Sequence, residues 1–281
     1  MKSEIIDLKD YEKSENTSAL HAELWRNGLA VLDDRLDEDL LQRLIAEVST
    51  ELTHSPFDFE VDGNFFYGQR IRRAVSLTHK CPSILEVLAL PVVEKVLTAT
   101  LLDYCEHALV STVSGLEVSH QPTAKPQFLH RDEGIYGKVA RVEGGMEYTM
   151  NLMIAGTEFT KENGATHLAP GSNRWPADRY PTEADPITQL VLPRGGMGVW
   201  LGSTYHGAGV NRTQTPRLGI IFTFCLGFLR TIDNQYLSFD IERVKTLPPA
   251  VQRLLGYDAH GPSLGTLNEG SPMKQWTAPN A

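Results

Sequence analysis

Apolar residues recur at helical spacing in the first hundred positions. Between residues 16 and 27 they form one face that ends at Gly28, a residue suited to the left-handed conformation that closes many helices. Residues 29–32 are a short apolar run that predicts a strand, and Asp37 is a candidate N-cap for a second amphipathic helix. A third helical stretch, 82–102, contains Pro91 where a new helix can begin. We therefore expect a helical layer over about residues 1–104.

From residue 105 onward the pattern changes from helical to alternating. Short apolar runs are separated by Gly, Pro and Asn, which is typical of strands joined by turns. Helices followed by many short strands predict a mainly β fold with helices, whose core at about 105–230 is a double-stranded β-helix, or cupin-like jelly roll. A C-terminal helix and tail occupy 231–281, and we expect residues 1–281 to form a single domain. The runs expected to form strands are 106–119, 147–155, 188–192, 197–201, 206–211 and 217–228.

Composition and charge limit the possible partners. The 281 residues are 41% hydrophobic and 22% charged, which is ordinary for a globular protein with a sizeable core. The net charge of −9 argues against nucleic acid or an anionic membrane surface as a partner. No apolar run is long enough to span a membrane, and the three cysteines show no paired spacing. We therefore expect a cytoplasmic protein with reduced cysteines that binds neither nucleic acid nor membranes.

One short stretch of the chain carries candidate chemistry. His130 and Asp132 are two residues apart, so in an extended segment their side chains fall on the same face. A third ligand would come from far along the chain, and His206 fits because glycines on both sides would let a bulky ligand approach the backbone. Two histidines and one carboxylate are the ligand set of non-haem Fe(II) oxygenases. An isolated histidine pair is more often part of a hydrogen-bonded core, so the metal site depends on further residues.

Three further residues occur in an order that supports the metal site. Gln127 precedes His130 by three residues, close enough to donate a hydrogen bond to a ligand on the metal. Thr166 follows an Asn-Gly turn on a short predicted strand. Arg217 begins a later strand, where a buried guanidinium could bind a carboxylate through two parallel hydrogen bonds.

With these residues in order, the sequence resembles the phytanoyl-CoA dioxygenase superfamily of Fe(II)- and 2-oxoglutarate-dependent oxygenases. The likeness is greatest to the fungal members that tailor meroterpenoids and indole alkaloids, and it runs from about Leu29 to about Tyr257. It includes Asn-Gly-Ala-Thr at 163–166, Pro-Gly-Ser at 170–172, and Val-Gln-Arg-Leu-Leu-Gly-Tyr at 251–257.

The resemblance implies both the cofactors and their ligands. Fe(II) and 2-oxoglutarate would be bound, O2 would be the co-substrate, and the protein would be a homodimer. Arg217 would hold the distal carboxylate of 2-oxoglutarate, with Gln127 and Thr166 as additional contacts. The residues implied to bind iron are His130, Asp132 and His206.

Strand parity suggests where a substrate would be contacted. If Arg217 points into the barrel, so does Thr223; Met150 on a facing strand and Tyr136 in the loop after Asp132 are similar candidates. The aromatic residues within 57–67 could form a lid, although such loops more often close the edge of a core. We expect a small, largely apolar polycyclic natural product, oxidised at an unactivated C–H bond by hydroxylation, desaturation, rearrangement or endoperoxidation.

Three other functions remain open at this point. An acyl-CoA 2-hydroxylase of the phytanoyl-CoA type would need a basic cluster, for which Arg70, Arg72 and Arg73 are the candidates. A non-catalytic jelly-roll subunit would need no iron ligands. A zinc hydrolase would act without oxygen or a keto acid.

Overall fold

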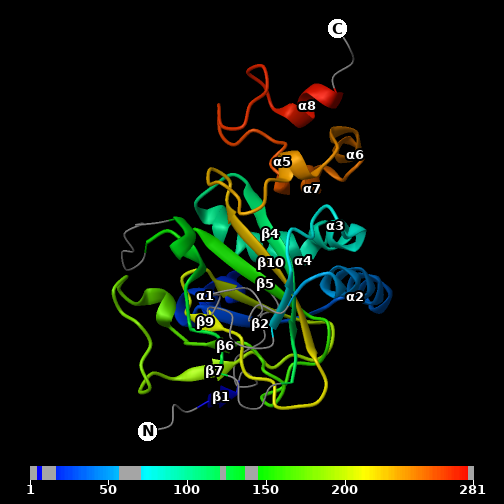
Figure 1. Cartoon of the computed structure of the whole chain (residues 1–281). Coiled ribbons are helices and arrows are strands. Elements are labelled where there is room, and N and C mark those ends of the chain that lie inside the picture. Colours follow the sequence, from blue (N-terminus) through cyan, green and yellow to red (C-terminus); the bar gives the residue numbers. More distant parts are fainter. Residues whose placement is uncertain (1–4, 8–16, 57–70, 121–124, 137–144, 278–281) are drawn as a thin grey trace.

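The larger of two sheets forms the centre of the molecule, as a computed structural model of the chain shows (Figure 1). The structure describes residues 5–7, 17–56, 71–120, 125–136 and 145–277. The aromatic residues at 57–67, Arg70 and part of the loop after Tyr136 lie outside the described residues. Six strands form this sheet in the order β2-β8-β5-β10-β4-β3, and every neighbouring pair is antiparallel. Their bounds are β2 Leu29–Arg35, β3 Ile71–Ala74, β4 Ala108–Val118, β5 Thr149–Ala155, β8 Gly196–Leu201 and β10 Arg217–Leu226.

The smaller sheet has four short strands in the order β1-β7-β6-β9. The N-terminal strand β1 pairs with β7 in parallel, and the sequence pattern did not predict this strand. The segment that contains His130 joins this sheet through an isolated bridge between His130 and His206. The bounds are β1 Ile5–Asp7, β6 His167–Leu168, β7 Ile187–Gln189 and β9 His206–Gly207.

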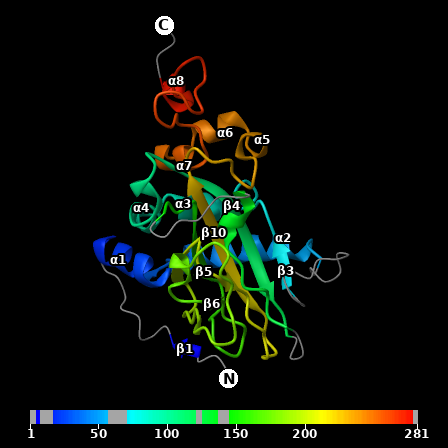
Figure 2. The same ribbon diagram turned by 90° about the vertical axis from the view of Figure 1, so that its left-hand side faces the viewer.

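The N-terminal helices pack against one face of the larger sheet. Their apolar faces join the alternate side chains of β5, β8 and β10 in one continuous buried cluster (Figures 1 and 2). Asp37 caps the second helix as predicted, because its carboxylate accepts hydrogen bonds from the backbone N–H groups of Asp39 and Leu40. The segment expected to be a helical layer also supplies β2 and β3 to the larger sheet. The helices are α1 Thr17–Asn27, α2 Glu38–Thr53, α3 Pro82–Leu88 and α4 Pro91–Thr98, followed by the 3₁₀ turn η3 Leu101–Asp103.

The C-terminal region adds short helices at the end of the larger sheet where β4 begins and β10 ends (Figures 1 and 2). The one helix predicted there, at 248–255, is present as α7, and three others surround it. Among the described residues no helix is long and apolar enough to cross a membrane. The helices are α5 Gln235–Ser238, α6 Ile241–Lys245, α7 Pro249–Leu254 and α8 Pro272–Thr277.

The opposite face of the larger sheet looks toward the smaller sheet. A second apolar cluster fills part of the space between them, with Trp200 and Phe159 completely buried in it. The rest of this space is a cavity, and all the predicted site residues except Tyr136 and Met150 line it.

Candidate metal centre

His130 and His206 are brought together by backbone pairing. The N–H of each residue donates to the carbonyl of the other, at 2.9 and 3.0 Å. Gly207 permits this approach, since a Cβ atom there would lie 3.0 Å from the carbonyl oxygen of Gln127. Gly207 therefore allows two backbone segments to lie in close contact, whereas the sequence had suggested that it leaves room for a ligand. Asp132 follows at the start of the 3₁₀ turn η4 (Asp132–Tyr136).

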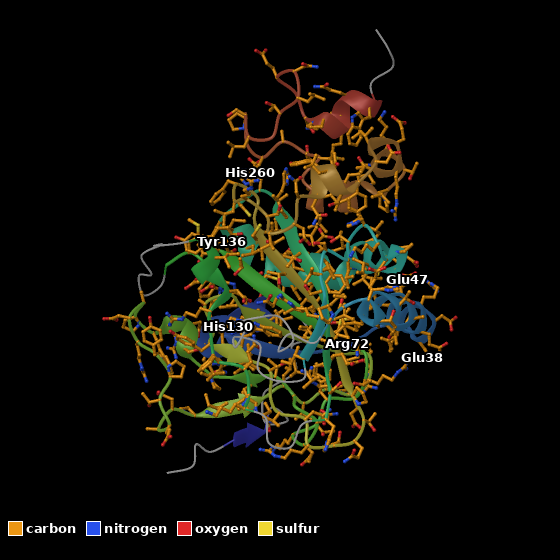
Figure 3. The ribbon with its side chains drawn as sticks, in the orientation of Figure 1. Glu38, Glu47, Arg72, His130, Tyr136 and His260 are labelled. Atoms are coloured by element: carbon orange, nitrogen blue, oxygen red, sulfur yellow. The ribbon has the colours of Figure 1, made fainter. Side chains whose placement is uncertain are left out.

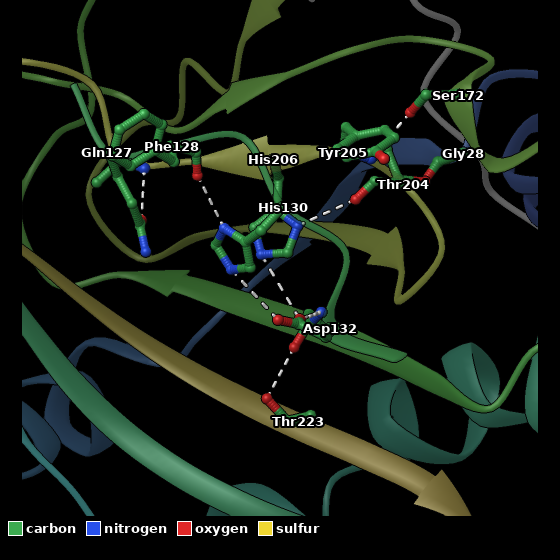
Figure 4. Close-up of polar contacts among 12 residues, drawn as sticks. Gly28, Gln127, Phe128, His130, Asp132, Ser172, Thr204, Tyr205, His206 and Thr223 are labelled. Atoms are coloured by element: carbon green, nitrogen blue, oxygen red, sulfur yellow. Dashed lines mark hydrogen bonds and ion pairs between the residues drawn. The ribbon is translucent and has the colours of Figure 1, made fainter. Parts of the chain in front are cut away.

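The three side chains converge on one small volume (Figure 4). His130 Nε2 lies 3.4 Å from Asp132 Oδ1, and His206 Nε2 lies 3.5 Å from Asp132 Oδ2. One ligand atom from each residue falls within 4.8 Å of the others, and the two imidazole centroids are 4.4 Å apart. Ligand atoms bound at about 2.0–2.2 Å to one ion lie about 3 Å from one another. A small inward movement of these three side chains would therefore let them bind one ion together.

Hydrogen bonds fix which imidazole nitrogens face the carboxylate. Nδ1 of His130 is 3.0 Å from the carbonyl oxygen of Phe128, and Nδ1 of His206 is 3.1 Å from that of Thr204 (Figure 4). A carbonyl only accepts, so in both rings Nδ1 carries the proton and donates it. The Nε2 atoms of both rings therefore face Asp132, the orientation found in histidines that bind metals.

The charge states of His206 and Asp132 suit a divalent cation. Burial lowers the pKa of His206 to about 4, so this imidazole is neutral near pH 7. Burial alone would raise the pKa of Asp132, but the two histidines and Asn151 hold it well below its usual range. Burial would lower the pKa of His130, yet the hydrogen bond and charge of Asp132 raise it. The residues therefore fit a metal ion, because two imidazole nitrogens and an ionised carboxylate point at one place.

Arg217 lies in the same cavity as the triad. Its side chain is 1% exposed, and neither Nε nor Nη1 has a hydrogen-bond partner among the described residues. The guanidinium stacks 4.3 Å from the ring centroid of Phe159, and burial lowers its pKa to about 9. A buried cation with free donors is costly unless it meets an anion, so the site fits the carboxylate of a bound acid.

The cavity has a volume of about 440 Å³ and is open at one side. The triad lines it together with Arg217, Gln127 and Thr166. Gln127 uses its side-chain oxygen to accept from the N–H of Ala208 at 2.9 Å, and Thr166 is buried. Most of the remaining wall is apolar: Ile71, Leu116, Val118, Ile135, Met153, Trp200, Ile221 and Ile232.

The three residues expected to contact substrate differ in their placement. Thr223 lines the cavity. Tyr136 does not: it lies nearer to the C-terminal helices than His130 does (Figure 3), and its hydroxyl donates to the carbonyl of Arg230 at 3.2 Å. Met150 pairs in register with Phe224 and is fully buried in the helix-facing cluster, on the other face of the sheet. We therefore withdraw Met150 as a candidate substrate contact, because side chains alternate along β5.

Asn151 was missed by the sequence analysis. It is completely buried in β5, and its side-chain nitrogen donates to Asp132 Oδ2 at 2.6 Å. The available signal was an amide in the middle of an otherwise apolar strand, because a buried amide needs a polar partner.

Comparison with known proteins agrees with this geometry. The family model of phytanoyl-CoA dioxygenase (PhyH) matches residues 24–219, which is well over half of the chain. The chain belongs to the phytanoyl-CoA dioxygenase family. Among similar sequences, Dioxygenase swnH1 of Metarhizium robertsii is 27% identical over 272 residues, covering 92% of this chain and 88% of the relative. Dioxygenase himG of Aspergillus japonicus is 27% identical over 292 residues, covering 91% and 86%.

Solved structures share the fold of this PhyH protein. The epimerase SnoN in complex with Fe3+, alpha ketoglutarate and nogalamycin RO superposes with a TM-score of 0.61 at 16% identity, covering 80% of this chain and 90% of SnoN. EctD from S. alaskensis with 2-oxoglutarate and 5-hydroxyectoine gives a TM-score of 0.58 at 16% identity, covering 80% and 83%. The predicted family, the mainly β jelly-roll fold and the dioxygenase class are confirmed. The predicted cofactors, Fe(II) and 2-oxoglutarate, are supported by the same findings together with the triad.

Proposed function

We propose that this PhyH protein oxidises an unactivated C–H bond of a small, largely apolar organic molecule. In this proposal His130, Asp132 and His206 hold Fe(II), and Arg217 holds the distal carboxylate of 2-oxoglutarate. One observation carries it: a buried arginine with free donors shares a single cavity with a two-histidine, one-carboxylate cluster. When bound, the iron and the keto acid together supply the means of activating O2 for hydrogen abstraction.

The chain's own residues bind, orient and exclude water. The carbonyls of Phe128 and Thr204 fix both imidazoles with Nε2 toward the metal position. Arg217 provides a fixed positive charge, and Gln127 and Thr166 add polar groups to the wall of the same cavity. Trp200, whose ring centroid is 5.1 Å from that of His206, places a large aromatic side chain beside the metal position and so limits the room for water there.

The wall indicates the kind of substrate. Apolar side chains dominate the cavity, and a volume of about 440 Å³ lies within the range of small-molecule pockets. A polycyclic natural product fits these features, with hydroxylation, desaturation, rearrangement or endoperoxidation as possible outcomes. Thr223 is the proposed polar contact with the substrate on the cavity wall. Tyr136 does not line the cavity, so it is a candidate only for an indirect effect on the substrate through the 3₁₀ turn η4, at whose end it lies. We also propose that the protein is located in the cytoplasm and forms a homodimer.

An anaerobic titration tests the proposal. Purified apoprotein is mixed with Fe(II) and 2-oxoglutarate, and the visible metal-to-ligand charge-transfer band is recorded. The band should saturate at one equivalent and should be absent from a His206→Ala variant of unchanged fold. Absence of the band from the unaltered protein would instead favour a non-catalytic jelly-roll subunit. Turnover without oxygen or keto acid would favour a zinc hydrolase.

A second candidate, acyl-CoA hydroxylation, is favoured by one observation. Arg73 lines the cavity and could meet the phosphates of CoA, whereas its neighbour Arg72 lies outside the lining. Saturable binding of an acyl-CoA that is lost in an Arg73→Glu variant would support this candidate. Equal binding of the free acid and its CoA ester would exclude it.

A further inference from the structure

The carboxylate of Asp132 is connected to the larger sheet by two hydrogen bonds in series. Asn151 donates from Nδ2 to Asp132 Oδ2 at 2.6 Å, and its Oδ1 accepts from the Thr223 hydroxyl at 2.7 Å. Asn151 is 0% exposed, while Thr223 lies on the adjacent strand β10 in register with it. Figure 4 shows Thr223 on the sheet facing Asp132. We call this chain of contacts the Thr223–Asn151–Asp132 relay.

The direction of each hydrogen bond in the relay is fixed by chemistry. A metal-binding carboxylate only accepts, so the NH2 group of Asn151 must face Asp132. The amide oxygen then faces Thr223, whose hydroxyl must donate. A reversed amide would place its oxygen against the carboxylate oxygen, so Asn151 has one acceptable orientation.

The relay restricts how the carboxylate can turn. Oδ2 accepts from Asn151 and lies 3.5 Å from His206 Nε2, while Oδ1 lies 3.4 Å from His130 Nε2. The hydrogen bond from Asn151 occupies one lone pair of Oδ2, so a carboxylate held in this way favours a metal bound through one oxygen. One-oxygen binding keeps a coordination position open, which an oxygenase needs.

We propose that Asn151 and Thr223 are positioning residues that hold Asp132 as a one-oxygen metal ligand. The proposal rests on the metal site proposed above and deepens it. Thr223, expected from sequence to touch substrate, thereby acquires a second role through a residue that never reaches the cavity. Its hydroxyl proton is committed to Asn151, so only acceptor lone pairs remain for a molecule in the cavity.

The test measures metal affinity in the full-length apoprotein, with Co(II) as the probe and no substrate or keto acid. Asn151→Leu keeps the branched shape and the number of side-chain non-hydrogen atoms but removes both hydrogen bonds, and it should weaken Co(II) binding about 10- to 100-fold. Thr223→Val removes only the second bond and should weaken binding about two- to tenfold, the value of one hydrogen bond. Thr223→Ser retains the hydroxyl and should restore wild-type affinity.

Thr112 offers a matched control for Thr223. It is the register partner of Thr223 on β4 and lines the same cavity, but it is not part of the relay. Thr112→Val should therefore leave the Co(II) affinity within about twofold of wild type, below the value of one hydrogen bond. The intensity of the Co(II) d–d bands should change in Asn151→Leu, because a carboxylate free to turn alters the coordination number.

A double variant separates positioning from a general structural effect. If Thr223 acts through Asn151, then Thr223→Val adds no further loss in the Asn151→Leu background. Additive losses, or equal effects of Thr223→Val and Thr112→Val, would overturn the proposal. So would wild-type Co(II) affinity in a folded Asn151→Leu protein; should that variant not fold, the Thr223 variants decide. A wild-type protein that binds no Co(II) would instead defeat the metal site itself, and the relay with it.

Discussion

Replacing Arg217 with methionine should make the protein more stable and its co-substrate binding much weaker. Methionine matches the apolar stem of arginine and can keep apolar contact with Phe159, but it removes the charge. The guanidinium is 1% exposed, and two of its three nitrogens lack a partner among the described residues. Stability and binding should therefore change in opposite directions.

Both magnitudes follow from this environment. Two charge-assisted hydrogen bonds to a carboxylate contribute about 1.5–3 kcal/mol each, so their loss weakens 2-oxoglutarate binding about 10²- to 10⁴-fold. An unpaired buried charge costs several kcal/mol, of which stacking on Phe159 returns at most about 2 kcal/mol. The apoprotein should thus gain about 1–3 kcal/mol, which raises Tm by about 2–10 °C in a chain of this size.

Calorimetry and thermal unfolding measure the two effects on the same preparations. The Kd of 2-oxoglutarate is determined with Mn(II) in place of iron, and Tm is determined for the apoprotein. An Arg217→Lys variant, which keeps charge but loses paired hydrogen bonds, should have intermediate affinity. Unchanged affinity in Arg217→Met would refute the anchor. A lower apoprotein Tm would show that the guanidinium has a structural partner.

Three further outcomes are expected. Removal of the metal by a chelator should lower Tm in the wild type but not in His206→Ala, because only the intact triad binds the ion; an equal decrease would place the ion elsewhere. Met150→Ala should lower the free energy of unfolding by about 2–5 kcal/mol, as measured by urea denaturation, with no change in the Kd of 2-oxoglutarate. A weaker Kd would show that Met150 reaches the cavity. Finally, apoprotein stability should decrease as pH falls from about 6.5 toward 4, because His206 stays neutral when folded but takes up a proton when unfolded. His206→Gln should flatten that curve, and an equally steep curve would assign the loss to other groups.

Two of the three candidate metal ligands could be placed together from sequence because they are only two residues apart. His130 and Asp132 do converge, although Asp132 begins a 3₁₀ turn and not a continuing extended segment, and Arg217 begins a strand as expected. The pairing of His130 with His206 depends on tertiary contact, and only the order of the surrounding residues indicated it. Of the small sheet, the strands β6, β7 and β9 lie at or beside the runs predicted around Thr166, 188–192 and 206–211, although each is shorter than expected or slightly displaced. Only β1 escaped prediction, because its three residues are too few for a pattern to repeat.

Strand parity was informative but incomplete as a guide to the cavity wall. It predicts that Met150 and Asn151 point to opposite faces of the sheet, yet it does not state which face borders the cavity. The register of β5 with β10 decides this, since Asn151 pairs with Thr223 and Met150 with Phe224. A buried amide needs a polar partner, and Asn151 stands among apolar neighbours in the sequence. Applying this rule would have assigned Asn151, and not Met150, to the face of β5 that borders the site.

Strand β10 has a consequence for how such a protein can diversify. It carries Arg217 at one end and Thr223 six positions later, both on the cavity face, across a span of about 20 Å. One residue inserted between Arg217 and Thr223 would turn one of the two side chains toward the helices. Their separation along β10 and their shared face of the sheet must therefore be kept together. New substrates must therefore be accommodated by changes elsewhere in the wall, such as at Ile71, Ile135 and Ile232, while β10 keeps its length.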